Sequence, residues 1–497
     1  MAARRAPRYH LRIAPPSPHL PLRLAILIGA LVDRAWRVDG LVDGDHFFRQ
    51  AHVLANVDGM LAHGLAVAPG TWNDDLFLHF YDFPVYQGLC AVLARATGLA
   101  APLVAEATNV AALGVLLLAT WRLGERLALG ALATTAALLL LALAPLGRFW
   151  FAAPSLDPFV VTLGTVSLAA WLDTGPDARP ARRRVATAVW LGTAFVATLA
   201  KSPTYLPVAV AILAAIVRRH GVAGLRRGPT LAFVAVLAAA QLLFVGIGAH
   251  ANADARGWPD RATELAWYFG SAAERFAIGP HAEVLARIAK QVLSVPVTIT
   301  ALVVLVARLA RPDAGRTFVT VWSLAAVGAS LLFLHVNVVH GYYQLPCLVP
   351  LALCGGAATA ALADRLRARR RTAAAVLLAL AAAATWSSER YLARLGAAST
   401  ATIRAAGAFV QQHTAPADYV LYARPTADDN PVFLYCAQRH GANVTGDLAP
   451  AALTATFAAR ATARGGRLVL FAPADVAAPT DGTPLAAGPA GRLWLLP

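Results

Sequence analysis

The sequence predicts an all-α polytopic membrane protein with about eleven transmembrane helices, followed by a small C-terminal α/β domain. The first observation is composition, because 58% of the 497 residues are hydrophobic and only 14% are charged. Soluble proteins carry about a quarter charged residues. The second is a series of apolar runs, many near the ~20 residues that cross a bilayer. The third is a change of pattern after Trp386, where short strand-like and helix-like segments alternate.

The apolar runs divide the first part of the chain into candidate transmembrane helices. Their predicted bounds are residues 20–33, 102–121, 128–146, 158–172, 185–200, 203–217, 230–248, 291–308, 317–335, 344–363 and 372–387.

The distribution of arginine predicts the orientation of these helices. If the N-terminus lies in the cytoplasm and the helices alternate in direction, every inside loop is basic, as the positive-inside rule requires. The inside loops are residues 122–126, 179–184, 218–227, 308–316 and 365–371. The outside segments hold most of the acidic residues, histidines and aromatics, and they are residues 34–101, 147–157, 201–202, 249–290, 336–343 and 388–497.

The first outside loop contains one further apolar stretch. Residues 84–97 are too few to span a bilayer, and a crossing there would turn the later basic loops outward. We therefore expect an amphipathic helix along the membrane interface, with Tyr81 and Tyr86 at headgroup depth.

The tail after the last apolar run predicts a separate folding unit. Strand-like runs are Tyr419–Tyr422, Arg467–Phe471 and Arg492–Leu496, and helix-like runs are Pro431–His440 and Ala451–Ala463. Strands and helices in alternation are typical of a small α/β domain. The predicted organisation is a transmembrane domain over residues 1–387, including the first outside loop, and an extracytoplasmic α/β domain over residues 388–497.

Composition also excludes several classes of function. The net charge of +16 comes from the basic inside loops. These basic residues do not form the basic face with interleaved aromatic residues that is typical of a nucleic-acid-binding protein. The four cysteines are scattered without metal-ligand spacing. The sequence has neither a P-loop nor a dinucleotide-binding glycine fingerprint, which argues against a nucleotide-activated donor.

Ionisable and aromatic residues gather in the predicted outside segments. Placing an ionisable residue at a membrane surface is energetically costly, so each one is a candidate for a functional role. Carboxylates can act as a base towards an acceptor hydroxyl or amine, and arginine or lysine can hold a donor phosphate and stabilise it as the leaving group. The candidates are Asp43, Asp45, His46, Arg49, Gln50, Asp82, Asp157, Lys201, His340, Tyr342 and Tyr343.

Some of these residues also have purely structural explanations. Asp82 and Asp157 each stand just before a proline at a predicted helix start, where helix N-capping is a competing role. Tyr342 and Tyr343 suit the aromatic belt of a membrane interface.

Several short motifs, in this order and on this side of the membrane, resemble the polytopic glycosyltransferases of the GT-C fold. The similarity is to family 39-like members, the protein mannosyltransferases and the lipid A aminoarabinose transferases. The motifs are Phe48-Arg49-Gln50, the run from Tyr81 to Gln87, Arg122 to Arg126, Pro154 to Asp157, Ala200 to Pro203, His340 to Pro346, and Tyr435 to Gly441.

The resemblance implies an inverting glycosyltransferase of the bacterial inner membrane. Its donor would be a sugar on a polyprenyl-phosphate carrier, and its acceptor an extracytoplasmic glycan, lipid or protein. Asp45 takes the role of base by its position, with Asp43 and Asp82 as alternatives. His46, Arg49, Gln50, Asp157, Lys201, His340, Tyr342 and Tyr343 would bind substrate. The three acids could also bind a divalent cation, although no ligand spacing demands one.

The main alternative function is a polytopic transporter or a flippase for lipid-linked sugars. Such proteins place charged residues near the membrane midplane, between internal repeats. Here the polar residues gather at one face instead, which favours the enzyme.

Overall fold

The computed structural model describes most of the chain. The described residues are 19–39, 46–67, 72, 80, 82–175, 178–253, 260–295, 297–299, 301, 314–365, 370–396, 400–424, 432–445, 451–473 and 482–497.

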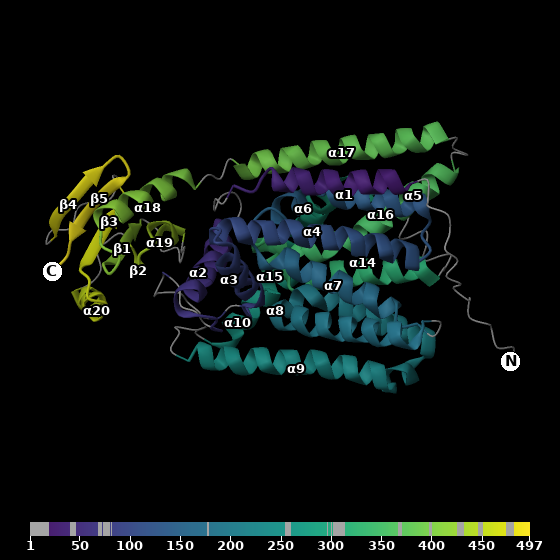
Figure 1. Cartoon of the computed structure of the whole chain (residues 1–497), viewed down its shortest axis with the longest axis horizontal. Coiled ribbons are helices and arrows are strands. Elements are labelled where there is room, and N and C mark those ends of the chain that lie inside the picture. The colour runs from purple at the N-terminus through teal and green to yellow at the C-terminus, as the bar shows by residue number, and fades with distance from the viewer. Residues whose placement is uncertain are drawn as a thin grey trace.

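The first part of the chain is a bundle of long helices that lie side by side (Figure 1). Four described segments are long and apolar enough to cross a membrane, namely residues 101–126, 180–220, 228–251 and 341–365. The chain is therefore a multi-pass membrane protein. The bundle helices are α1 (Leu20–Ala35), α4 (Ala101–Arg126), α5 (Ala131–Leu143), α7 (Leu156–Leu172), α8 (Pro180–His220), α9 (Gly228–Ala251), α14 (Ala314–Leu332), α16 (Leu348–Arg365) and α17 (Arg370–Gly396).

Helix α8 is a hairpin rather than one straight rod. Its backbone leaves the helical region at Lys201, with φ −162° and ψ 87°. Ser167 Oγ lies 3.2 Å from the Trp190 carbonyl oxygen and 2.9 Å from the Tyr205 hydroxyl. In a straight helix those two residues would stand about 22 Å apart. The chain thus turns back at Lys201, as the separate runs at 185–200 and 203–217 predicted.

The run at residues 291–308 differs from the expected single helix. Helix α12 (Ile278–Arg287) continues as a π-helical turn, η2 (Ile288–Leu293), and then breaks at Ser294. Ser294 has φ +93°, a left-handed conformation that a serine adopts only under local constraint. Residues 302–313 lie outside the described part of the chain.

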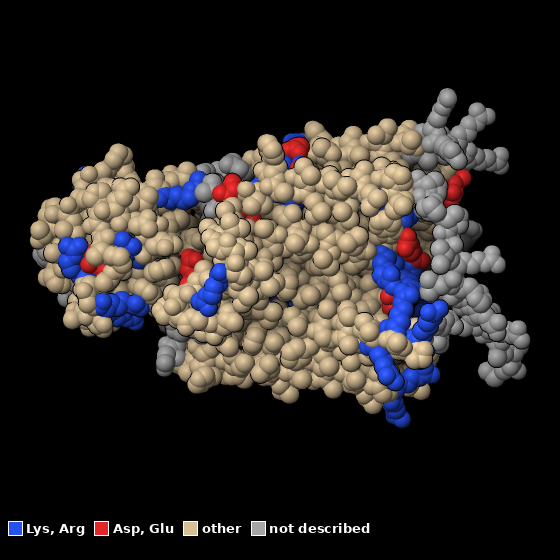
Figure 2. Space-filling view, in the orientation of Figure 1, with Lys and Arg blue, Asp and Glu red and all other residues tan. Residues whose placement is uncertain are grey.

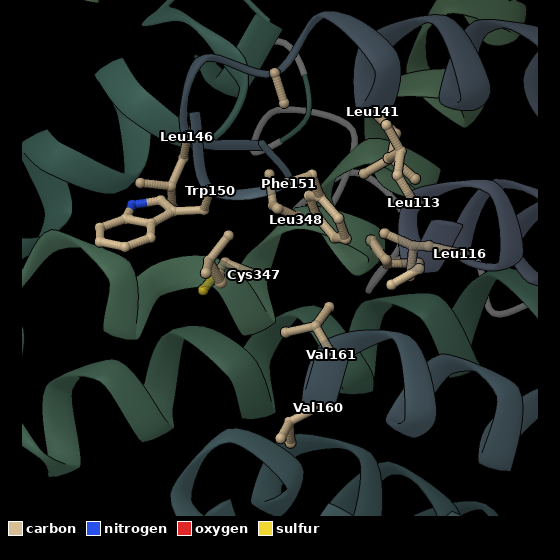
Figure 3. Close-up of a cluster of buried hydrophobic side chains, with 14 of the residues drawn as sticks. Leu113, Leu116, Leu141, Leu146, Trp150, Phe151, Val160, Val161, Cys347 and Leu348 are labelled. Carbon is tan, nitrogen blue, oxygen red and sulfur yellow. The ribbon is translucent and has the colours of Figure 1, made fainter. Parts of the chain in front are cut away.

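The core of the bundle joins helices that are far apart in sequence. Figure 3 shows one buried cluster that contains Leu113 and Leu116 of α4, Val160 and Val161 of α7, and Leu348 of α16. Small residues allow some helices to approach closely, as is common in membrane bundles. An added Cβ at Gly356 of α16 would collide with the Ala133 carbonyl oxygen of α5.

The described residues of the predicted first outside loop contain two helices, α2 (Phe47–His63) and α3 (Val85–Thr97). Helix α3 matches the predicted helix at residues 84–97, whereas α2 was not predicted. Tyr86 is fully buried within the protein and donates to the Ala105 carbonyl of α4 at 2.7 Å, so its hydroxyl does not face the lipid headgroups. Tyr81 lies outside the described residues.

Short helices occupy the remaining connections between bundle helices. They are α6 (Pro145–Trp150), η1 (Val222–Arg226), α10 (Arg261–Phe269), α11 (Ala272–Phe276), α15 (Leu334–Val339) and η3 (Gly341–Cys347).

The C-terminal domain is a five-stranded sheet in the order β2-β1-β3-β5-β4. Strands β1, β2 and β3 are parallel and β4 and β5 are antiparallel. The predicted strands at β1, β3 and β5 and the helices at α19 and α20 are confirmed, whereas β2, β4 and α18 were not predicted. The elements are α18 (Ala401–His413), β1 (Tyr419–Arg424), α19 (Val432–Ala437), β2 (Gly441–Thr445), α20 (Ala451–Ala463), β3 (Leu468–Ala472), β4 (Thr483–Gly488) and β5 (Gly491–Leu495).

Alternation along β1 explains how helices cover both faces of this sheet. Tyr419 and Leu421 pack with Phe457 of α20, whereas Val420 packs with Phe433 of α19. Side chains of a strand point alternately to opposite faces, so the buried run that looked like one strand in sequence supports two apolar layers.

The C-terminal domain contacts the first outside loop directly. The Gly441 N–H donates to the Trp72 carbonyl oxygen at 3.0 Å, and the Trp72 and His440 rings lie 5.0 Å apart. Asp58 of α2 accepts a hydrogen bond from Gln438, and burial raises the pKa of Asp58 to about 6. The tail and the first loop therefore lie at the same end of the bundle (Figure 1).

Candidate active site

A buried lysine–aspartate pair occupies the turn of the α8 hairpin. Lys201 Nζ lies 2.7 Å from Asp157 Oδ1, and the side chains are 4% and 0% exposed. Asp157 stands in the first turn of α7, where the helix N-terminus favours a negative charge. The N-cap of that helix is Ser155, so Asp157 does not have the capping role that its sequence position allowed. Its second oxygen, Oδ2, has no hydrogen-bond partner among the described residues.

A second buried pair joins the first outside loop to this site. Arg49, in the first turn of α2, forms an ion pair with Asp82. Burial opposes ionisation of Asp82, but the positive charges of Arg49 and Lys201 outweigh it and hold the pKa of Asp82 below its usual value. Burial likewise opposes the charge of Arg49, and the Asp82 carboxylate raises the pKa of Arg49 despite it. The N-cap of α3 is Pro84, so Asp82 is not a helix cap either.

Two tyrosines of η3 form an aromatic wall against the lysine. Lys201 Nζ lies 4.1 Å from the ring centre of Tyr343 and 4.8 Å from that of Tyr342. A cation held at this distance from an aromatic face is stabilised by the ring. Tyr342 does not face lipid as an aromatic-belt residue would, because it is only 5% exposed.

Two histidines extend the site towards the loop. His46 Nδ1 lies 3.3 Å from His340 Nδ1, and the His46 ring packs edge-on against Tyr342 and stacks on Trp150. Burial, together with the positive charges of His46, Lys201 and Arg49, lowers the pKa of His340 to about 3. His340 is therefore neutral at physiological pH. His46 itself adopts a left-handed backbone with φ +50°, which fixes the direction in which the loop enters α2.

Two small cavities lie beside the aromatic wall. One is lined by Tyr343, Thr204, Pro346 and Phe333. The other shares Thr204 and Pro346 with it and is also lined by Trp322 of α14 and Val349 of α16. Both apolar and polar side chains line them, including Ser330 and Asn337 in the first and Thr165 in the second.

Eight of the eleven predicted site residues come together in this cluster. They are His46, Arg49, Asp82, Asp157, Lys201, His340, Tyr342 and Tyr343. Gln50 is buried beside Arg49 in α2. Asp43 and Asp45 lie outside the described residues. Among the described residues no group of three histidine, cysteine, aspartate or glutamate side chains is placed to hold a metal ion.

Trp150 and Tyr268 also lie at the site and had not been predicted. Trp150 of α6 stacks on His46 and lies 5.1 Å from the Tyr342 ring. Tyr268 of α10 is partly buried, and desolvation together with the nearby Tyr343 and Asp82 raises its pKa. Burial and the charge of Arg49 lower the pKa of His52 to about 4. Their positions in the sequence could have indicated a place in the site, because Trp150 and Tyr268 both stand in predicted outside segments.

The fold is similar to that of solved membrane glycosyltransferases. ArnT from Cupriavidus metallidurans bound to undecaprenyl phosphate matches with a TM-score of 0.66 at 14% identity, over 96% of this chain and 98% of that one. The Archaeoglobus fulgidus oligosaccharyltransferase matches with a TM-score of 0.58 at 12% identity, over 90% and 68%. The mycobacterial arabinofuranosyltransferase AftD matches with a TM-score of 0.57 at 15% identity, over 96% and 40%.

Neither a protein-family model nor a curated protein matches the chain in sequence. At identities of 12–15% the likeness establishes the architecture. The chain has the GT-C fold, as the motifs in its sequence predicted.

Proposed function

We propose that the chain is a glycosyltransferase that takes a sugar from a polyprenyl-phosphate carrier and transfers it to an extracytoplasmic acceptor. The observation that carries this proposal is the pair of buried cations, Arg49 and Lys201, each held by its own carboxylate, with Lys201 against the rings of Tyr342 and Tyr343. Two such cations match the negative charge of a lipid-linked phosphate. The neighbour ArnT was solved with such a ligand, undecaprenyl phosphate.

The two cations supply the electrostatic part of the reaction. In the proposed step the acceptor oxygen attacks the anomeric carbon from the face opposite the phosphate, and the new C–O bond forms with inversion. The bond between that carbon and the phosphate oxygen breaks, and its electron pair stays on the phosphate. Arg49 and Lys201 stabilise this leaving group, because pre-positioned charges in a water-poor site act most strongly on developing charge.

The carboxylates divide into two roles in this proposal. Asp82 and Asp157 hold the two cations, and the lowered pKa of Asp82 makes it a weak base. Removal of the acceptor proton therefore falls to the start of the first loop, before α2, where Asp45 is the proposed base and Asp43 its alternative. Because α2 follows these residues directly and carries Arg49, the base and the phosphate-binding group belong to one short segment.

The deciding experiment combines a deletion strain with one variant. Deleting the gene is expected to remove a sugar from a surface glycan, lipid or glycoprotein, and the wild-type copy is expected to restore it. Asp45→Asn is expected to leave the modification absent while the protein accumulates in the membrane at wild-type level, because the amide cannot accept the proton. Mass spectrometry of the cell-envelope glycans provides the measurement. Full restoration by Asp45→Asn would reject the base assignment, and an unchanged glycan profile in the deletion strain would reject the transferase.

The proposed location is the bacterial inner membrane, with a cytoplasmic N-terminus and an extracytoplasmic C-terminal domain. The contact between Gly441 and Trp72 supports a common side for the tail and the first loop. A reporter enzyme fused after residue 390 is expected to be active only outside the cytoplasm, and one fused within residues 218–227 only inside, as the arginine pattern requires. A cytoplasmic signal from the first fusion would reverse the topology.

A further inference from the structure

A cluster of arginines at the opposite end of the bundle has no part in the proposed reaction. Arg122 and Arg126 lie in the last turns of α4, Arg182 lies in the first turn of α8, and Asp173 is the C-cap of α7. Arg122 Nε donates to Asp173 Oδ2 at 2.9 Å, Arg126 Nη2 lies 2.6 Å from Oδ1, and Arg182 Nη2 lies 3.6 Å from Oδ2. These four residues are called the Asp173 cluster below.

The Asp173 cluster carries an excess of positive charge that water can reach. Among the described residues, three guanidinium groups share one carboxylate, and each has five N–H donors, so Asp173 offsets one of their three positive charges and accepts from only a few of their donors. The three arginine side chains are 43%, 26% and 41% exposed, whereas Asp173 is 11% exposed. The nearby Glu125 does not compensate them, because it accepts from Arg23 at 3.1 Å and from Trp121 at 2.6 Å.

A similar group near the active site shows what a purely structural cluster looks like in this protein. Asp33 of α1 pairs there with Arg34, Arg37 and Arg148, and Glu389 of α17 also pairs with Arg148. Arg34 and Arg148 are only 1% and 7% exposed, and Arg37 is 34% exposed. Two carboxylates face three arginines there and two of the three cations are enclosed, so that group mainly joins helices. The Asp173 cluster differs in both respects.

Exposed apolar residues continue from the Asp173 cluster along both flanking helices. On α4, Val115 and Leu118 are 47% and 53% exposed and precede Arg122 at helical spacing. On α8, Val185 and Val189 are 64% and 39% exposed and follow Arg182 at the same spacing. Residues three or four positions apart share a helix face, and both helices pack against α7. Each stripe therefore leads from an arginine into the membrane-spanning part of the bundle.

We propose that the Asp173 cluster binds the phosphate of an anionic phospholipid, whose acyl chains lie along the α4 and α8 stripes. Figure 2 shows Lys and Arg side chains gathered at this end of the bundle, away from the C-terminal domain. Guanidinium groups bind phosphate through paired hydrogen bonds, and basic pockets between transmembrane helices on the cytoplasmic side bind anionic headgroups. This lipid site is independent of the proposed transferase activity.

The test measures lipid binding to the full-length protein purified in detergent. Phosphatidylglycerol is titrated while native mass spectrometry counts bound lipid and a thermal scan follows unfolding, with phosphatidylcholine as the neutral lipid. The wild type is expected to bind phosphatidylglycerol in preference and to unfold at a higher temperature with it. The double variant R122Q/R182Q is expected to bind phosphatidylglycerol at least tenfold more weakly.

A matched control separates a site from general surface charge. R218Q/R219Q also removes two positive charges, but from exposed positions in the last turn of α8. This variant is expected to bind phosphatidylglycerol as the wild type does. Equal weakening in both double variants would overturn the site, and so would equal protection by inorganic phosphate, which would indicate a small-anion site. If R122Q/R182Q does not fold, the single variant R182Q decides, because Arg182 makes the longest contact to Asp173.

Discussion

Replacing Lys201 with methionine is expected to lower the rate of sugar transfer at least 100-fold and to weaken binding of the polyprenyl-phosphate donor. A charge-assisted hydrogen bond contributes about 1.5–3 kcal/mol, which corresponds to roughly a 10- to 150-fold change in binding. Further loss is expected in the transition state, where the phosphate gains charge as the sugar leaves. Binding of undecaprenyl phosphate and transfer in the deletion strain provide the two measurements.

The same substitution is expected to destabilise the protein, and a second substitution separates the two effects. K201M leaves Asp157 buried without its partner, since Asp157 is 0% exposed. Removing one partner of a buried ion pair costs about 3–5 kcal/mol. In K201M/D157N the unpaired charge is gone, so stability in a thermal scan is expected to recover while transfer stays lost. Recovery of transfer in the double variant would show that Lys201 has only a structural role.

The bundle was predictable from the sequence because hydrophobic burial and loop charge depend on local composition. The turn at Lys201 illustrates this. A lysine between two apolar runs, in a segment expected outside, is an exception to the rule that basic residues lie inside, and it stands where the chain reverses. The same reasoning placed Asp157 and Lys201 at one end of the bundle. It did not predict that they form a pair, because a contact across 44 residues depends on how α7 and α8 pack.

Other parts of the site depend on tertiary contacts that leave no periodic signal. Helix α2 was not predicted although it carries Arg49, because its face is buried by α3, α4 and the C-terminal domain rather than by lipid. Tyr86 resembled an interfacial tyrosine, yet its hydroxyl is satisfied by the Ala105 carbonyl within the protein. Strand β4 is the edge of its sheet and only partly buried, so it lacks the apolar run that identified β1 and β3.

Replacing Arg49 with glutamine is expected to have the second large effect, because Arg49 is the one phosphate-binding candidate carried by the first loop. R49Q removes the charge that holds Asp82 ionised, so the pKa of Asp82 is expected to rise towards that of a buried carboxyl, and donor affinity is expected to fall about 10- to 150-fold from loss of a charge-assisted contact. R49K keeps a charge but cannot reproduce the planar donor group of arginine, so it is expected to restore only part of the affinity.

A second buried arginine provides the comparison that distinguishes binding from folding. Arg148 pairs with Asp33 and Glu389 at the same end of the bundle and is 7% exposed, close to the 8% of Arg49. R148Q is expected to reduce thermal stability while each folded molecule keeps wild-type affinity for undecaprenyl phosphate. R49Q is expected to lose that affinity in the folded fraction as well. If both variants lost affinity only in proportion to unfolded protein, Arg49 would be a structural residue and the phosphate would have to be held by Lys201 alone. The contrast between two arginines of equal burial therefore tests whether the pairing with Asp82 exists to present a cation to the donor.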